Sequence, residues 1–119
     1  MANELTLSAS VKFLKSDTNV DFAKAGVLLD VAGGDYVKRT QTVGTSEEAL
    51  GLGDLTTPGY MLIYNSDSTN YVKIRSGTGA GDLIRVPAGG IALFYCEATA
   101  PYIIANTASV VVEYLLVEA

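Results

Sequence analysis

The chain has 119 residues and a formal charge of −5, from 13 acidic against 8 basic residues, and it contains one cysteine and no histidine. A chain of this length forms about one domain with one core, so we expect a single domain spanning residues 1–119. The absence of histidine removes the commonest general base at neutral pH and excludes a Ser-His-Asp or Cys-His enzyme, while the scattered basic residues do not supply the converging cations that bind nucleic acid or an anionic membrane.

The first 36 residues contain one clear strand and one ambiguous segment. Apolar and polar side chains alternate over residues 4–13, which is the period of a half-buried strand. Residues 15–19 have turn chemistry. The next segment also fits a short helical face, through Phe22, Ala25, Leu28 and Leu29. We predict a strand at residues 27–31 instead, because Gly26 interrupts the helix and Gly33-Gly34-Asp35 resembles a hairpin turn.

Residues 36–57 combine a strand with a long connection. Residues 36–43 are rich in Thr, Val and Tyr, but neither face is cleanly apolar, which favours an edge strand protected by its charges. Residues 44–57 fit either a one-turn helix capped by Thr45 or Ser46, or a loop with its three leucines turned inward.

The clearest structural signal lies at residues 58–76. Tyr60–Asn65 and Tyr71–Ser76 are rich in aromatic and β-branched residues, and the Asn, Asp and Ser residues between them are typical of a tight connection. We predict a β-hairpin here. Its side chains expected in the core are Met61, Ile63, Val72 and Ile74.

The last third predicts four more strands. Residues 76–81, SGTGAG, lack the Lys-Ser/Thr ending of a phosphate-binding loop, so they indicate a hairpin loop. Strands are expected at residues 82–86, 91–97, 102–105 and 110–117. The sum is an antiparallel β-sandwich, of which the jelly roll is one arrangement, in preference to a closed barrel.

The final strand is apolar on both faces, with Glu113 as its only charge. A sandwich strand buries one face, so a second cover is needed, either a loop of the same chain or a neighbouring subunit. We expect the subunit. The candidate oligomer interface is Val110, Val112, Tyr114 and Leu116.

The sequence gives little support for a catalytic or metal site. The carboxylate pairs Asp30/Asp35 and Glu47/Glu48 lie in predicted strands, turns or loops without a shared cleft, and turn chemistry accounts for Asp67 and Asn70 better than a calcium site does. Cys96 is the only cysteine, which excludes an intrachain disulfide and favours a buried thiol. We expect no enzyme activity and no cofactor.

Seven tyrosines and no tryptophan leave a carbohydrate-binding face open as an alternative. The candidate outward face is Tyr60, Tyr64 and Tyr71, with Tyr102 as a further candidate for stacking on a sugar. The N-terminus has no charged leader followed by an apolar run, so we expect no secretory signal and synthesis in a cytoplasm. No apolar segment is long enough to span a membrane.

Three segments resemble small all-β structural proteins of tailed bacteriophages. They are GYMLIYNSDSTNYVKI, IRVPAGGIALF and SVVVEYLLVE, and the similarity covers about residues 41–119. The resemblance implies a virion protein, made in the host cytoplasm, that decorates or cements the capsid, or else a tail, baseplate or fibre-attachment component. It also implies a homo-oligomer, with a trimer favoured, and the major capsid protein or other virion proteins as partners. It assigns no functional residue.

Overall fold

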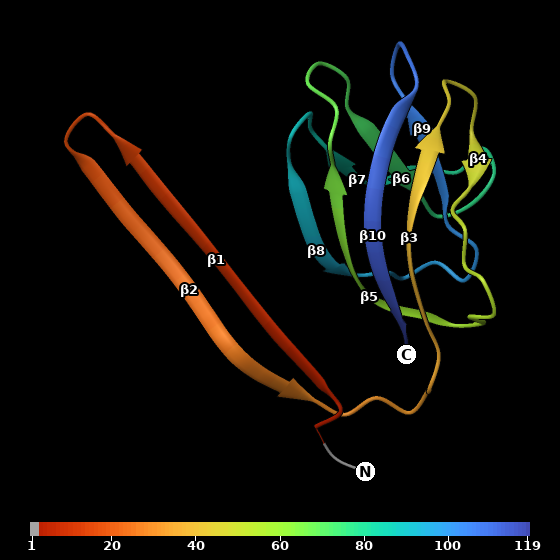
Figure 1. Cartoon of the computed structure of the whole chain (residues 1–119), viewed down its shortest axis with the longest axis horizontal. Coiled ribbons are helices and arrows are strands. Elements are labelled where there is room, and N and C mark those ends of the chain that lie inside the picture. The colour runs from red at the N-terminus through yellow and green to blue at the C-terminus, as the bar shows by residue number, and fades with distance from the viewer. Residues whose placement is uncertain (1–2) are drawn as a thin grey trace. The chain divides into compact units, whose positions relative to one another are not determined.

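The computed structural model describes residues 3–119, and every regular element among them is a β-strand. The all-β class expected from the sequence is therefore confirmed. The chain divides into two units, one ending at Ala32 and the other comprising Gly33–Ala119 (Figure 1). The strands are β1 (Leu5–Lys15), β2 (Thr18–Leu29), β3 (Tyr36–Val43), β4 (Glu48–Ala49), β5 (Pro58–Asn65), β6 (Val72–Arg75), β7 (Asp82–Val86), β8 (Ile91–Tyr95), β9 (Tyr102–Ala105) and β10 (Val110–Glu118).

The first unit is a long antiparallel hairpin of β1 and β2. Its turn is Ser16-Asp17, where Ser16 has a φ of 52°. The choice of a strand over a helix for the second half of this segment is confirmed, but the expected bounds of 27–31 are wrong. β2 begins at Thr18, continues through Gly26 and ends at Leu29. Gly33–Asp35 is not a hairpin turn either, because β2 pairs with β1 and β3 pairs with β10. The sandwich is therefore built from Gly33–Ala119 and not from the whole chain.

The apolar residues of β2 change parity along the strand, from even positions near the turn to odd positions near its end. In a regular strand the two sets would face opposite sides. A β-bulge prevents this, because one extra residue of β2 lies opposite the step from Leu7 to Ala9. Gly26 takes the left-handed conformation, with φ at 67°, and its N–H donates to Ser8 Oγ at 3.2 Å. One face of the hairpin thus carries Leu5, Leu7, Ala9, Val11, Phe13, Val20, Phe22, Val27 and Leu29.

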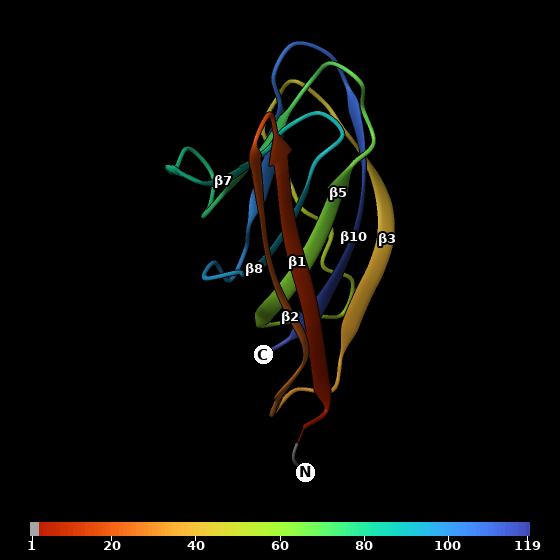
Figure 2. The ribbon, with the colours of Figure 1, turned by 90° about the vertical axis from the view of Figure 1, so that its left-hand side faces the viewer.

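The second unit is a sandwich of two four-stranded sheets, ordered β3-β10-β5-β8 and β4-β9-β6-β7. Figure 2 shows β10 between β3 and β5. Its first strand, β3, pairs with its last, β10, and the pairs β4–β9, β5–β8 and β6–β7 are nested inside this one. This nested pairing of eight strands in two sheets is the jelly-roll connectivity.

The core lies between the two sheets of the sandwich. Strand parity places alternate side chains there, and each of the four predicted at residues 58–76 is fully buried. The two loop leucines Leu50 and Leu55 close the core at its side. The fully buried aliphatic side chains are Val43, Met61, Ile63, Val72, Ile74, Val86, Ile103, Val110, Val112 and Leu116.

The hairpin predicted at residues 58–76 does not form. β5 pairs with β10 and β8, whereas β6 pairs with β7 and β9 in the other sheet. The polar loop between them therefore crosses from one sheet to the other. Two strands that face each other across a core show the same alternation as two strands of a hairpin, because both turn their apolar sides inward. The pattern therefore placed the side chains correctly and the strand pairing wrongly.

Other connections agree with the sequence. β3 is an edge strand of its sheet, as its mixed faces predicted. Residues 44–57 form a loop with the two-residue strand β4, which decides against the one-turn helix. Residues 76–81 join β6 to β7 as a hairpin loop, and the N–H of Gly79 donates to the carboxylate of Glu47 at 2.8 Å.

Candidate functional site

The predicted oligomer interface is part of the core. Val110, Val112 and Leu116 are fully buried and Tyr114 is 3% exposed, all on the side of β10 that faces the second sheet. Side chains enclosed by their own chain offer no area to another subunit. The cover for this face is the β4-β9-β6-β7 sheet, so the residues left open on β10 are those of the opposite parity.

Tyr114 also closes a polar cluster at the edge of the core. Its hydroxyl donates to the carbonyl oxygen of Gly51 at 2.6 Å, and Gln41 Oε1 is 3.2 Å away. Gln41 in turn accepts the Gly51 N–H at 2.9 Å and donates to Glu48 at 3.0 Å. Burial raises the pKa of the Tyr114 hydroxyl above its ordinary value. These bonds hold the loop before β5 against β3 and β10.

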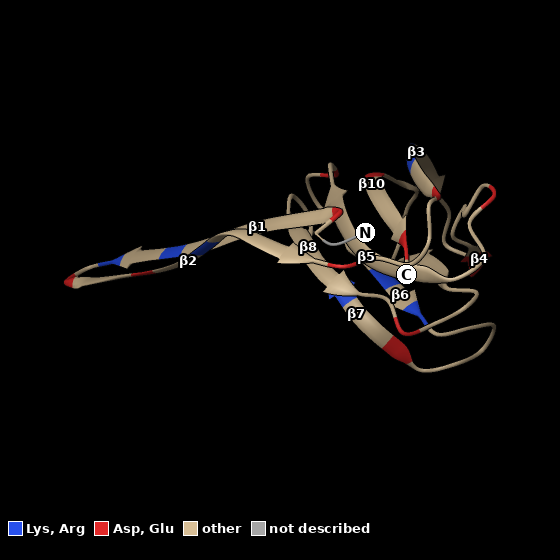
Figure 3. Ribbon diagram, turned by 90° about the horizontal axis from the view of Figure 1, so that it is seen from below, with Lys and Arg blue, Asp and Glu red and all other residues tan. Residues whose placement is uncertain are grey.

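The outer face of the β4-β9-β6-β7 sheet is adapted to water. Arg75 pairs with Glu47 at 2.9 Å and with Asp82 at 2.8 Å, and Lys73 pairs with Asp82 at 3.1 Å. Figure 3 shows these basic and acidic positions together on β6 and β7. The Arg75 hydrogen bond lowers the pKa of Asp82, which keeps that carboxylate charged. This face needs no further cover.

The outer face of the β3-β10-β5-β8 sheet is apolar instead. The register aligns its side chains in rows across the strands, with Leu115 beside Leu62 and Leu62 beside Leu93. The exposed fractions reach 66% at Ile91 on the edge strand β8 and 69% at Tyr36 on the edge strand β3. We call this surface the apolar sheet face. Its polar members are Lys38, Thr40, Thr42 and Glu113, and its apolar members are Tyr36, Tyr60, Leu62, Tyr64, Ile91, Leu93, Tyr95, Val111, Leu115 and Val117.

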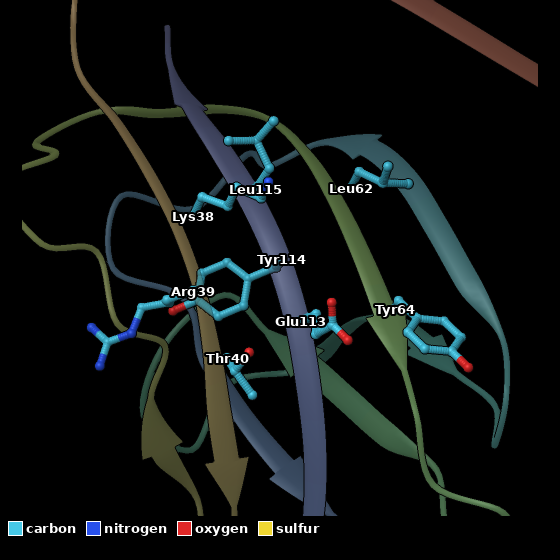
Figure 4. A pocket seen from close by; sticks show the side chains of 8 residues that line it. All are labelled: Lys38, Arg39, Thr40, Leu62, Tyr64, Glu113, Tyr114 and Leu115. Atoms are coloured by element: carbon cyan, nitrogen blue, oxygen red, sulfur yellow. The ribbon is translucent and has the colours of Figure 1, made fainter.

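A shallow hollow of about 540 Å³ lies on the apolar sheet face (Figure 4). Leu62, Tyr64 and Leu115 line it, together with the charged side chains Lys38, Arg39 and Glu113. Glu113 stands opposite Tyr64 in the strand register, near the middle of the sheet. This arrangement can receive an apolar group from a partner and a cation beside Glu113.

The three tyrosines of the candidate binding face do not share one surface. Tyr60 and Tyr64 are on the apolar sheet face, where the rings of Tyr60 and Tyr95 meet edge to face with centroids 5.3 Å apart. Tyr71 precedes β6 in the other sheet, because the crossing loop separates it from β5. The guanidinium of Arg85 covers its ring at 3.8 Å from the centroid. A flat sugar-stacking platform of all three rings is therefore excluded.

The hairpin is the second apolar surface without a cover. Its one-sided stripe leaves Phe22 65% exposed, and Val11, Phe13 and Val20 are more than half exposed as well. Lys24 stands on the same side, with Nζ 5.4 Å from the Phe22 ring centroid. The alternation in β1 predicted that its apolar side chains share one side. The expected half-burial of this strand is wrong, because every residue of β1 except Leu5 and Leu7 is exposed.

The Asp67 carboxylate stabilises the loop between β5 and β6. Asp67 Oδ2 accepts the N–H groups of Thr69 and Asn70 at 3.0 and 2.7 Å, and these bonds lower the pKa of Asp67. This confirms turn chemistry there. Within residues 3–119 no three Asp, Glu or Cys side chains gather closely enough to hold a metal ion. The Asp30 and Asp35 pair is divided between the two units.

Glu118 has a role that the sequence did not indicate. One carboxylate oxygen accepts the N–H groups of Gly34 and Asp35, and the other accepts the N–H and hydroxyl of Thr56 at 3.3 and 3.0 Å. The bonds from Thr56 are the main cause that lowers its pKa. Glu118 thereby fixes the entry to β3 and the loop before β5 to the end of β10. A terminal Glu after an apolar strand is too common a pattern to reveal this.

Cys96 is buried, and burial raises the pKa of its thiol, which fits the expected inert side chain. Residues 3–119 include no helix with the length and hydropathy needed to span a bilayer. No family model, no curated protein and no solved structure matches this chain.

Proposed function

We propose that this protein is a structural, non-enzymatic component of an assembly, and that it works by binding copies of itself and the surface of a larger shell. The observation that carries this proposal is the contrast between the two outer sheet faces. Ion pairs cover one of them, whereas the other exposes leucine, isoleucine, valine and tyrosine side chains. Large exposed apolar patches on small domains mark interaction surfaces.

The assembly is a virion of a tailed bacteriophage, in which the protein decorates or cements the capsid as a homo-oligomer, with a trimer favoured. The resemblance of residues 41–119 to phage structural proteins supports this assignment. The jelly-roll connectivity agrees with it, since this architecture recurs in viral capsid and lectin domains, although a fold alone assigns no function. Many copies would stabilise a shell through weak contacts that add by avidity.

Light scattering of the full chain after size-exclusion chromatography, over a wide range of concentration, tests the self-assembly. An oligomer is expected, and a monomer at every concentration would contradict this part. Mass spectrometry of purified phage particles from the source of the sequence tests the location. The chain is expected at many copies per particle, and its absence from the particles would overturn the virion assignment.

A second candidate function is glycan binding at the hollow of the apolar sheet face. The side chains of Tyr64 and Glu113 adjoin there, so that a ring face and a carboxylate are available to one sugar (Figure 4). A glycan array that binds the chain and loses binding with Tyr64→Ala, while Tyr71→Ala leaves it unchanged, would favour this function over the structural one.

A further inference from the structure

We propose that copies of this protein exchange their hairpins, so that the apolar side of the β1–β2 hairpin of one copy covers the apolar sheet face of a second copy. This proposal rests on the self-assembly in the proposed function and names the two surfaces that meet. It does not depend on the virion assignment.

The hairpin requires a cover that its own unit does not provide. A two-stranded antiparallel hairpin is marginally stable in water by itself, and stability needs a further layer against its apolar side. The stripe on β1 and β2 includes two aromatic and several β-branched side chains, and its members near the turn are more than half exposed. The bulge at Gly26 keeps this stripe on one side over the whole length of the hairpin, as a docking surface requires.

The apolar sheet face is also exposed, and its dimensions match those of the hairpin. β5 has eight residues and β1 has eleven, which at about 3.3 Å per residue are roughly 26 and 36 Å long. Two strands about 4.8 Å apart make a ribbon roughly 10 Å wide, which lies along two of the four strands of the sheet. The hairpin is therefore long enough to cover the face from end to end.

The area favours exchange between two copies over a single docked hairpin. One ribbon on one sheet removes roughly 260 Å² of flat area from each surface, or about 500 Å² in all, which is well below the ~1,000 Å² that a biological interface should exceed. Two hairpins exchanged between two copies reach about 1,000 Å² before the corrugation of the side chains is included. In a closed ring each copy likewise gives one hairpin and receives one.

Charge complementarity supports the same pairing. The stripe side of the hairpin carries two charged side chains, the cations Lys15 and Lys24. The sheet face carries Glu113 near its middle, on β10, and the cations Lys38 and Arg39 line its hollow from the edge strand β3. A hairpin that lies over β10 and β5 places a cation next to Glu113 and leaves Lys38 at the rim. Two apolar sheet faces packed on each other would instead bring two Glu113 carboxylates into the same interface.

Two variants and a control test the proposal by light scattering of the full chain. Phe22→Asp places a carboxylate on the hairpin stripe, and Leu62→Asp places one on the apolar sheet face. The control is Leu83→Asp on β7 of the other sheet, where the leucine is 42% exposed against 45% for Leu62. We expect each of the first two to raise the dissociation constant at least about 100-fold, because a buried unpaired charge is costly, and the control to match the unaltered chain.

Mixing distinguishes this pairing from the alternatives. Phe22→Asp keeps an intact sheet face and Leu62→Asp keeps an intact hairpin, so an equal mixture retains one of the two exchanged contacts. The mixture should therefore associate more strongly than either variant does with itself, and more weakly than the unaltered chain. An oligomer that survives Phe22→Asp but not Leu62→Asp would mean sheet-to-sheet packing, and the reverse would mean hairpin-to-hairpin packing; both overturn the proposal while leaving self-assembly intact. If the unaltered chain is a monomer, both the hairpin exchange and the self-assembly in the proposed function are overturned.

A cross-link keeps the test decisive if a carboxylate variant fails to fold. The double variant Phe22→Cys/Leu62→Cys should form disulfide-linked dimers and larger species on a non-reducing gel after mild oxidation. Leu62→Cys alone and Phe22→Cys alone serve as controls for self-contacts at each surface. A monomer with an internal disulfide would show that the hairpin covers the sheet of its own chain, which contradicts exchange.

Discussion

Asn65 links the two sheets of the sandwich through its side chain, and its replacement by alanine tests that link. It is the last residue of β5 and is fully buried. Its Nδ2 donates to the carbonyl oxygens of Asn70 at 2.9 Å and Val86 at 3.2 Å, while its Oδ1 accepts the Asp67 N–H at 2.9 Å. Val86 belongs to β7 in the opposite sheet. The side chain therefore ties the crossing loop and the second sheet to the end of β5.

Asn65→Ala should lower the free energy of unfolding by about 2–5 kcal/mol. The Val86 carbonyl lies in the core, where water does not replace the lost donor, and an unpaired buried acceptor costs about 1–3 kcal/mol. The two part-buried bonds in the loop each add roughly 0.5–1 kcal/mol. The total is a large fraction of the ~5–15 kcal/mol that stabilises a typical domain.

Urea unfolding followed by tyrosine fluorescence measures this change, at one fixed protein concentration because association shifts apparent stability. Asn70→Ala is the matched control. The side chain of Asn70 accepts an exposed bond from the Thr107 hydroxyl, at 2.6 Å, and makes a weaker one with the Asp67 carboxylate. Because water can replace both, their loss should cost less than about 1 kcal/mol. If Asn65→Ala lies within about 0.5 kcal/mol of the control, the side chain does not hold the sheets together and the reasoning is refuted.

Two further predictions concern β10. Tyr114→Phe keeps the ring and removes the hydroxyl bond to Gly51, so it should lower the unfolding free energy by about 1 kcal/mol without changing the oligomeric state in light scattering; a folded but dissociated variant would show that Tyr114 is at an interface after all. Glu118→Gln should reduce stability at neutral pH and matter less in acid, as thermal unfolding against pH would show. The lowered pKa of Glu118 means that its contribution is present above the unfolded value near 4.5 and is lost as the pH falls through the folded value. A difference in unfolding temperature that stays constant from pH 7 to about pH 3 would contradict this.

The period-two pattern was sufficient for the class of the fold and for most inward-facing side chains. It identified Met61, Ile63, Val72 and Ile74 as core residues, and the edge position of β3 followed from its two mixed faces. These are local properties, since the alternation of side chains belongs to each strand by itself. The chemistry of turns is local as well, and Asp67 behaves as its sequence context indicated.

Which strands pair, and which surface covers an apolar face, depend on residues far apart in the chain. The sequence was insufficient to predict either property. β5 and β6 could form a hairpin or belong to opposite sheets. The local sequence does not distinguish the two arrangements, because the same side chains point inward in both. The parity change along β2 looked like a weak helix, and only the register with β1 shows that a bulge at Gly26 unites its apolar residues.

The sequence by itself determined that β10 has two apolar faces, that the chain forms antiparallel strands and that it has no histidine chemistry. The tertiary structure alone decided which face of β10 is covered. The second sheet encloses Val112 and Leu116, so the open face is that of Leu115 and its neighbours. The physical reason is that hydrophobicity is a property of each residue, whereas burial depends on which other surface of the folded chain lies against it.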